Sequence, residues 1–145
     1  MHTQFFLENS DATERFGAQF FPKLPSKALI FLDGNLGAGK TTFVRGLLRA
    51  AGVTGAIKSP TYSLVEEYEI GQRKIFHFDL YRLAEPDELE WIGIDDYLNQ
   101  NALCFIEWAQ KGAGILPNPD LIIRLEMQQS GRLLKIDNKN CKISM

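Results

Sequence analysis

The chain has few cysteines, no long apolar run and little net charge, and each of these absences removes a class of function. Its 145 residues include two cysteines, Cys104 and Cys141. Two thiols without metal-ligand spacing argue against both a disulfide framework and a structural zinc site. No stretch approaches the roughly 18 consecutive apolar residues that a membrane-spanning helix needs. The N-terminus has neither a basic start nor a long apolar run, so we expect no signal peptide and a cytoplasmic protein.

Charge sets a further limit on the partners of this chain. The formal net charge is -2 and the sequence pI is about 5.7. Proteins that bind nucleic acid on their own usually carry a basic patch and a high pI, so we expect any contact with RNA to be indirect. The 45% hydrophobic and 23% charged residues are typical of a globular domain. The sequence does not set an oligomeric state.

Strand and helix patterns alternate in the first half of the chain and hairpins follow. Strands are predicted at residues 4–8, 28–33, 62–70, 74–79, 102–107, 121–127 and 132–137, and helices at 10–24, 40–52 and 85–93. Ser10, or Asp11 with Glu14, fits the start of the first helix. This order predicts an α/β fold with three layers and a mixed central β-sheet. We expect one domain over 1–137 and a loose tail over 138–145.

The stretch G-N-L-G-A-G-K-T, from Gly34 to Thr41, fits G-x-x-x-x-G-K-[ST] at every fixed position. A buried strand precedes it and a helix begins at Lys40, which is the context that a P-loop requires. Glycines let successive backbone N–H groups turn toward phosphate oxygens, and the helix N-terminus adds partial positive charge. The Lys40 ammonium suits the β- and γ-phosphates, and the Thr41 hydroxyl suits Mg²⁺. The predicted nucleotide-binding residues are Asn35, Leu36, Gly37, Ala38, Gly39, Lys40, Thr41 and Thr42, of which Thr42 either faces the phosphates or caps the helix.

Two strands end in an acid that could serve the metal of such a site. I-F-H-F-D ends at Asp79 and A-L-C-F-I-E ends at Glu107. The second run is the more uniformly apolar, so the pattern favours Glu107 as the acid on the metal side. Asp79 is then expected to order the attacking water, or to contact a ligand of the metal without binding the metal itself. A solvated strand end is the alternative for either acid.

Four other residues carry more modest expectations. In S-P-T-Y-S, Thr61 lies where many P-loop hydrolases place a threonine that senses the γ-phosphate. His77 is expected to be a hydrogen-bonded structural residue and Trp91 a core residue. Trp108 is expected to pack in the core or to form a wall beside the nucleotide.

The motifs G-N-L-G-A-G-K-T-T, S-P-T-Y-S-L-V-E-E-Y, H-F-D-L-Y-R-L, E-L-E-W-I-G-I-D-D-Y and F-I-E-W occur in this order. With them the chain closely resembles the TsaE (YjeE) family of bacteria, over about residues 5–136. The resemblance implies a P-loop NTPase fold and a weak Mg²⁺-dependent ATPase required for threonylcarbamoyladenosine formation at adenosine 37 of tRNA. It also implies a protein partner, the TsaB–TsaD complex, which the ATPase resets between turnovers.

The same resemblance assigns residues. It implies that Thr41 and Glu107 carry Mg²⁺, and that Thr61 and Asp79 are the switch-like threonine and the essential aspartate. The implied catalytic set is therefore Lys40, Thr61, Asp79 and Glu107. Trp108 matches a residue beside the nucleotide, and Ser10 and Arg132 match, more loosely, residues on the base side.

Other readings of a P-loop stay open. A small-molecule kinase usually carries an arginine-rich lid, whereas the arginines after Lys74 are only Arg82, Arg124 and Arg132. A guanine-specific GTPase would carry Asn-Lys-x-Asp, and the nearest string, N-K-N-C, ends in cysteine. A nucleotide-binding scaffold with little hydrolysis uses the same loop and also remains possible.

Overall fold

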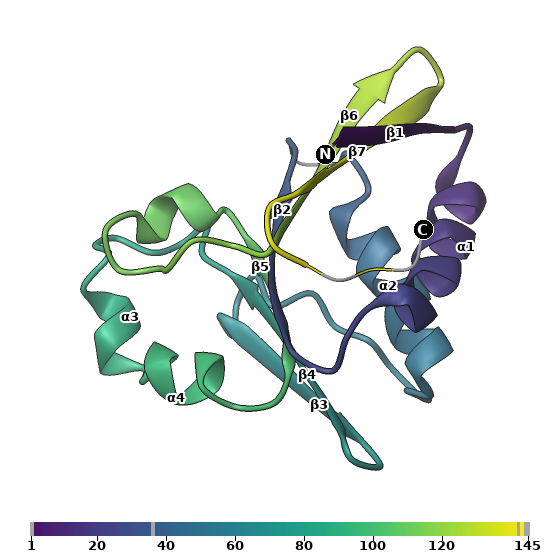
Figure 1. Ribbon diagram of the computed structural model, residues 1–145. Coiled ribbons are helices and arrows are strands. Elements are labelled where there is room, and N and C mark those ends of the chain that lie inside the picture. Colours follow the sequence, from purple (N-terminus) through teal and green to yellow (C-terminus); the bar gives the residue numbers. More distant parts are fainter. Residues whose placement is uncertain (1, 36, 142, 144–145) are drawn as a thin grey trace.

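A single seven-stranded β-sheet forms the centre of the computed structural model, which describes residues 2–35, 37–141 and 143 (Figure 1). The strands are β1 (His2–Leu7), β2 (Ala28–Asp33), β3 (Val65–Ile70), β4 (Arg73–Asp79), β5 (Leu103–Glu107), β6 (Leu121–Gln128) and β7 (Gly131–Asn138). The helices are α1 (Ser10–Phe20), α2 (Lys40–Ala51), α3 (Glu88–Trp91) and α4 (Ile94–Leu98), with 3₁₀ turns η1 (Phe21–Lys23) and η2 (Ala109–Gly112).

The sheet is parallel at its centre and antiparallel at both edges. Its strand order is β1-β7-β6-β2-β5-β4-β3. The neighbours β6/β2, β2/β5 and β5/β4 are parallel, whereas β1/β7, β7/β6 and β4/β3 are antiparallel. The unbroken apolar runs of β2 and β5 suit these central positions, because both faces of a parallel strand are covered.

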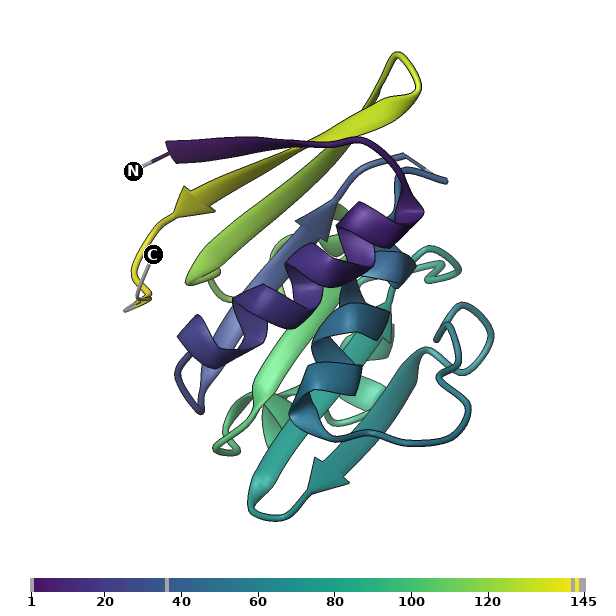
Figure 2. The ribbon, with the colours of Figure 1, turned by 90° about the vertical axis from the view of Figure 1, so that its right-hand side faces the viewer.

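Helices cover the two faces of the sheet separately. α1 and α2 lie together on one face, and α3 and α4 lie on the other (Figures 1 and 2). Two apolar cores result, one under each helical layer. The predicted three-layer α/β fold with a mixed sheet is confirmed.

The register of β4 against β5 decides where the polar residues of these strands lie. Asp79 is paired with Glu107 and His77 with Phe105. Ile75 belongs to the core beneath α2, and Phe76 belongs to the core on the opposite face. Because strand residues alternate between faces, His77, Asp79 and Glu107 point toward the α2 side.

Two glycines allow α1 and α2 to pack closely. A Cβ at Gly46 would collide with the backbone oxygen of Glu14, and a Cβ at Gly17 would collide with that of Phe43. Only glycine permits backbones to approach this closely. The middle of α1 is thereby packed closely against the first two turns of α2.

Several sequence predictions need correction. The N-cap of α1 is Asn9, whose side chain accepts a hydrogen bond from the Ala12 N–H (2.8 Å), so Ser10 is not the cap. The helix ends at Phe20, and a 3₁₀ turn occupies the next three residues. Trp91 is 90% exposed and is not a core residue. The predicted helix over 85–93 is only the four residues of α3, and the separate helix α4 follows it.

β7 extends through Asn138, whose side chain makes two hydrogen bonds with the backbone of Cys141 (2.9 Å each). Cys141 packs against the core beneath α2. The tail over 138–145 stays a prediction as a separate unit. No helix in the described ranges combines the length and the apolar character that crossing a bilayer requires.

Cys104 is expected to resist alkylation in the folded protein. Its side chain is buried in β5, and burial raises the pKa of its thiol to about 12. A thiol with this pKa is thiolate to the extent of only on the order of 10⁻⁴ at pH 8, and the thiolate is the reacting form. We expect iodoacetamide to modify Cys104 at least about 100-fold faster in guanidinium than in buffer. Peptide mass spectrometry measures both rates, and similar rates would contradict the burial.

Candidate nucleotide-binding site

A cleft opens where α2 begins and where β4 and β5 end. It is lined by Ser10, Gly37, Gly39, Lys40, Thr41, Thr42, Ser59, Thr61, Asp79, Glu107 and Arg132. The carboxyl ends of parallel strands and the N-terminus of a helix meet here, which is where open α/β sheets place their ligands. Anions are favoured at this end of α2, because the first backbone N–H groups of a helix have no acceptor within it.

The loop before α2 depends on its glycines. Gly39 precedes the helix with a φ of 104°, a left-handed conformation that glycine adopts without strain. A Cβ at Gly34 would lie 2.5 Å from the backbone oxygen of Leu125, so the loop passes too close to β6 for any side chain there. The glycine spacing that defines the motif is thus required by the local geometry.

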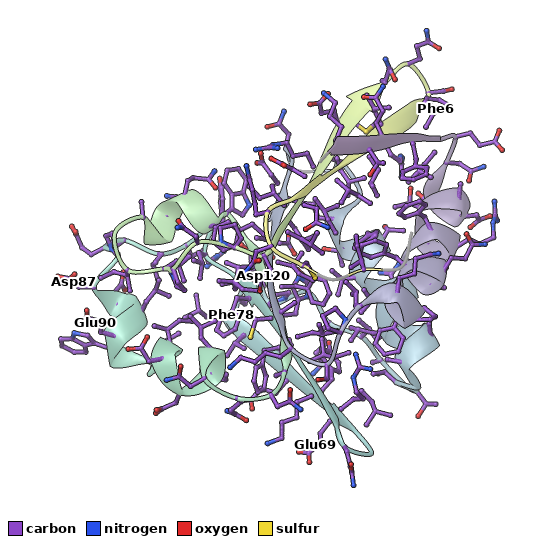
Figure 3. The ribbon with its side chains drawn as sticks, in the orientation of Figure 1. Phe6, Glu69, Phe78, Asp87, Glu90 and Asp120 are labelled. Carbon is purple, nitrogen blue, oxygen red and sulfur yellow. The ribbon has the colours of Figure 1, made fainter. Side chains whose placement is uncertain are left out.

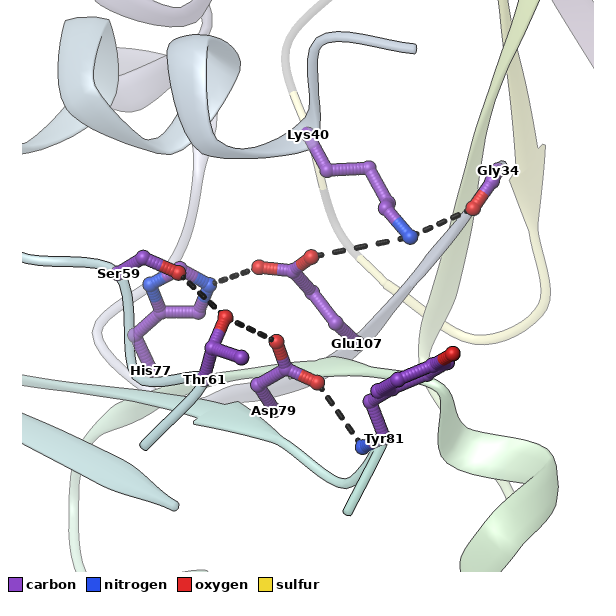
Figure 4. Close-up of polar contacts among 8 residues, drawn as sticks. All are labelled: Gly34, Lys40, Ser59, Thr61, His77, Asp79, Tyr81 and Glu107. Carbon is purple, nitrogen blue, oxygen red and sulfur yellow. Dashed lines mark hydrogen bonds and ion pairs between the residues drawn. The ribbon is translucent and has the colours of Figure 1, made fainter. Parts of the chain in front are cut away.

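Lys40 is the first residue of α2 and its side chain is buried within the cleft. Its ammonium donates a hydrogen bond to the Gly34 carbonyl oxygen (2.5 Å) and lies 3.8 Å from Oε1 of Glu107 (Figure 4). The ammonium also lies over the ring of Trp108, 4.7 Å from its centroid. A buried cation surrounded by these groups is positioned to neutralise phosphate charge.

Glu107 is held by a histidine from the neighbouring strand. His77 Nε2 lies 2.6 Å from Glu107 Oε2, and both side chains are buried. An ionised carboxylate only accepts hydrogen bonds, so Nε2 is the donor. Nδ1 of His77 is buried without a hydrogen-bond partner among the described residues. His77 therefore orients the carboxylate, in agreement with its prediction as a hydrogen-bonded structural residue.

Asp79 is joined to the segment that contains Thr61. The Thr61 hydroxyl donates to Asp79 Oδ2 (3.0 Å) and lies 2.8 Å from the Ser59 hydroxyl. The backbone N–H of Tyr81 donates to Asp79 Oδ1 (2.9 Å). Figure 4 shows this chain of contacts beside the Glu107–Lys40 pair. Both oxygens of the buried Asp79 carboxylate thus have a donor.

Arg132 reaches the cleft from β7, far along the chain. Its Nη1 donates to the Thr13 hydroxyl of α1 (3.2 Å), which itself donates to the Asn9 carbonyl oxygen (3.0 Å). A Cβ at Gly39 would lie 3.3 Å from the same Nη1 atom. The guanidinium is buried, and its Nε has no partner in the part of the chain that the structure describes. Arg132 therefore adds a fixed positive charge beside the loop.

Trp108 borders the cleft rather than lining it. It adopts a left-handed backbone conformation with a φ of 58° and packs partly against the core under α3 and α4. Its ring contacts that of Tyr81 at a centroid distance of 4.9 Å. Core packing thus applies in part, and the role of Trp108 as a wall beside the nucleotide stays a prediction. Arg82 lies over the Tyr62 ring, 4.2 Å from its centroid.

Most residues predicted for the site meet in one place. The residues brought together are Ser10, Gly37, Gly39, Lys40, Thr41, Thr42, Thr61, Asp79, Glu107 and Arg132. Asn35 is exposed in the loop and its carbonyl accepts from the Ala38 N–H (3.1 Å), while Ala38 is buried. Leu36 lies outside the described residues.

Sequence reasoning did not select Ser59 or Thr13 for the site. Ser59 lines the cleft, and Thr13 holds Arg132. The S-P-T-Y-S motif could have indicated Ser59, because Ser59 is a hydroxyl residue two positions before Thr61. No local signal marks Thr13, whose partner is 119 residues away.

A strand, a glycine loop ending in Lys-Thr and a helix, opening on a cleft with two strand-end carboxylates, define a protein of the P-loop NTPase fold. A crystal structure of Bacillus subtilis YdiB shares this fold, with a TM-score of 0.75 and 24% identity, covering 99% of this chain and 87% of that one.

The particular family follows from the sequence comparisons. The sequence model described as "Threonylcarbamoyl adenosine biosynthesis protein TsaE" matches residues 7–134. The tRNA threonylcarbamoyladenosine biosynthesis protein TsaE of Haemophilus influenzae is 49% identical over 127 residues, covering 84% of this chain and 80% of the relative. The protein of that name from Synechocystis is 41% identical over 114 residues, covering 74% of this chain and 71% of the relative. This chain belongs to the TsaE family.

Proposed function

We propose that this protein binds ATP with Mg²⁺, hydrolyses it slowly, and acts in the cytoplasm in threonylcarbamoyladenosine formation on tRNA. Its partner would be the TsaB–TsaD complex, which it would reset between turnovers. The observation that carries the proposal is the convergence of Lys40, Thr41, Thr61, Asp79 and Glu107 on one cleft. Family membership supplies the biosynthetic context.

The donor set of the cleft fits Mg²⁺ and a triphosphate. Mg²⁺ prefers hard oxygen ligands and is commonly held by a carboxylate, a hydroxyl and the phosphates themselves. The Thr41 hydroxyl and the Glu107 carboxylate would hold it, and a bound Mg²⁺ would neutralise phosphate charge. His77 fixes the orientation of Glu107 for this purpose (2.6 Å). Lys40 and Arg132 would supply further positive charge from two sides of the loop.

Thr61 and Asp79 are proposed to couple nucleotide state to hydrolysis. Asp79 is buried and directly hydrogen-bonded to Thr61 (3.0 Å), so movement of one side chain changes the surroundings of the other. A threonine that turns toward the γ-phosphate would release Oδ2 of Asp79. That oxygen would then be free to accept a hydrogen bond from the attacking water.

A nucleotide-binding scaffold with little hydrolysis is the second candidate. The favouring observation is that both oxygens of Asp79 already accept hydrogen bonds, from Thr61 and from the Tyr81 N–H, so neither is free for an attacking water. A kinase has less support, because Arg124 pairs with Asp33 (3.4 Å) and Arg82 stacks on Tyr62. Neither arginine lines the cleft.

The test compares ATP hydrolysis by the purified protein with and without the TsaB–TsaD complex of the same organism, in Mg²⁺ and in EDTA. We expect at least about 10-fold stimulation by the complex in Mg²⁺ and loss of the activity in EDTA. A parallel assay of tRNA modification should require this protein. Tight ATP binding without stimulated hydrolysis would support the scaffold, and absence of ATP binding would refute both candidates.

A further inference from the structure

Ser59 lies at one end of a chain of hydrogen bonds whose direction can be worked out. The Thr61 hydroxyl donates its single proton to Asp79 Oδ2 (3.0 Å). The same hydroxyl oxygen lies 2.8 Å from that of Ser59, so in this pair Thr61 can only accept and Ser59 donates. Figure 4 shows the order from Ser59 through Thr61 to Asp79. The Ser59 proton is therefore directed at the position that the Thr61 oxygen occupies.

The backbone fixes the turn that contains Ser59 and Thr61 to β4. The carbonyl oxygen of the buried Pro60 accepts from the Leu64 N–H (2.8 Å), and the Leu64 carbonyl oxygen accepts from the Asp79 N–H (3.0 Å). Leu64 has a φ of 73°, a left-handed conformation that persists in a residue other than glycine only where surrounding contacts impose it. Main-chain contacts thus hold this turn beside Asp79 in addition to the side-chain bond from Thr61.

The position of the Thr61 hydroxyl oxygen meets the requirements of an attacking water. Under the proposed function, Thr61 turns toward the γ-phosphate and its oxygen leaves this position. A water there would lie 2.8 Å from the Ser59 hydroxyl oxygen and 3.0 Å from Asp79 Oδ2, both hydrogen-bond distances. It would accept from Ser59 and donate to the carboxylate, which leaves one lone pair of the water for the phosphorus. Ser59 is exposed and lines the cleft, so water can reach it.

We propose that Ser59 positions the attacking water for ATP hydrolysis, by donating a hydrogen bond to the water oxygen while Asp79 accepts a water proton. The inference rests on the proposed function, to which it adds a residue. In this step the water oxygen forms a bond to the γ-phosphorus. The bond from this phosphorus to the β–γ bridging oxygen breaks, and its electron pair leaves with ADP. One water proton passes to Oδ2 of Asp79, the other stays on the released phosphate, and Ser59 keeps its own proton.

Two other roles for Ser59 predict different behaviour. A serine that only orients Thr61 acts through the Thr61 hydroxyl, so its removal has no effect once that hydroxyl is absent. A serine that binds the phosphates or Mg²⁺ contributes to the affinity for ATP. A serine that holds the water contributes to the rate and not to the affinity, with or without the Thr61 hydroxyl.

The test measures single-turnover ATP hydrolysis and ATP affinity of the full chain with the TsaB–TsaD complex and Mg²⁺. Ser59→Ala should lower the rate at least about 10-fold, because a preorganised donor to a reacting oxygen is lost. Its ATP affinity should stay within about twofold of the natural chain, which also shows that the variant is folded. Ser59→Thr keeps a hydroxyl and should retain the rate to within about threefold.

The matched control is Ser63→Ala. Ser63 is an exposed serine of the same segment and is not among the described residues that line the cleft. Its removal should change the rate by less than about twofold. A second comparison places Ser59→Ala in a Thr61→Ala background. There the further loss should again be at least about 10-fold, because Ser59 holds the water directly.

The outcomes separate this inference from the proposed function. If Ser59→Ala hydrolyses ATP as fast as the natural chain, or if it loses ATP affinity in place of rate, Ser59 does not position the water and the ATPase function stands. If the loss disappears in the Thr61→Ala background, Ser59 only orients Thr61 and the inference is wrong. If the natural chain hydrolyses no ATP with the complex, the proposed function fails and this inference fails with it.

Discussion

Lys40→Ala is expected to lower the affinity for ATP at least about 100-fold, which corresponds to about 2.7 kcal/mol. The ammonium lies 3.8 Å from Glu107 and 2.5 Å from the Gly34 carbonyl oxygen. Under the proposed function, the Lys40 ammonium would exchange the Gly34 carbonyl for phosphate oxygens when a triphosphate binds. Without the ammonium the phosphates lose a charge-assisted hydrogen bond and meet the Glu107 carboxylate uncompensated. Titration calorimetry with ATP and Mg²⁺ measures the change.

The control for this variant is Lys135→Ala. Lys135 pairs with Glu126 on the exposed β6–β7 hairpin (3.2 Å), and exposed pairs contribute about 0–1 kcal/mol to stability. Its ATP affinity should stay within about twofold of the natural chain. Because Lys40 is buried, circular dichroism must show that the variant is folded. A folded Lys40→Ala protein with unchanged ATP affinity would mean that the loop does not bind phosphate.

Elements with strong local patterns could be predicted from the sequence almost to the residue. β2 coincides with the predicted strand at 28–33, because an unbroken apolar run bounded by a glycine has one sensible interpretation. α2 begins at Lys40 and ends against Gly52, whose φ of 109° suits the left-handed cap expected of a glycine. In both elements the decisive signals are local.

Errors arose where packing at a distance decides the outcome. Trp91 has the spacing of a core residue, yet α3 is too short to turn it inward and Leu89 and Ile94 fill the space. The N-cap of α1 is Asn9, one residue before the predicted Ser10. Both residue types are good caps, and only the backbone geometry decides which of them caps the helix. The local sequence alone therefore does not determine whether Trp91 is buried or which residue caps α1.

The same distinction applies to the site. Lys40 and Thr41 belong to a contiguous motif, and Asp79 and Glu107 end strands, so each could be proposed alone. Their relation could not, because it depends on β4 and β5 being parallel neighbours with Asp79 opposite Glu107. The bond from His77 to Glu107 crosses 30 residues for the same reason. Sequence patterns predicted the candidate residues, and strand order determines which of them meet.

Asp79→Asn is expected to reduce ATP hydrolysis in the presence of the TsaB–TsaD complex at least about 100-fold, with ATP affinity within about threefold of the natural chain. The carboxylate accepts two hydrogen bonds, from the Thr61 hydroxyl and the Tyr81 N–H. An amide of the same size accepts only at its single oxygen and donates at its other end, so it cannot accept from Thr61 at one end and from Tyr81 at the other. Binding should be spared because Lys40 and the loop are unchanged.

The rate and the affinity must be measured on the same protein for the Asp79→Asn result to be decisive. Phosphate release gives the rate, and calorimetry gives the affinity. Glu69→Gln is the matched control, because it neutralises an exposed carboxylate on the β3–β4 hairpin, away from the cleft (Figure 3). Thr61→Val removes the hydroxyl that Asp79 accepts from, so under the proposed coupling it should lower the rate in the same direction. If Asp79→Asn hydrolyses ATP as fast as the natural chain, Asp79 is a structural residue that only closes the turn at Tyr81. If Asp79→Asn hydrolyses ATP slowly while Thr61→Val hydrolyses it at the rate of the natural chain, Asp79 keeps its role in hydrolysis. Thr61 is then excluded as the residue that controls Asp79.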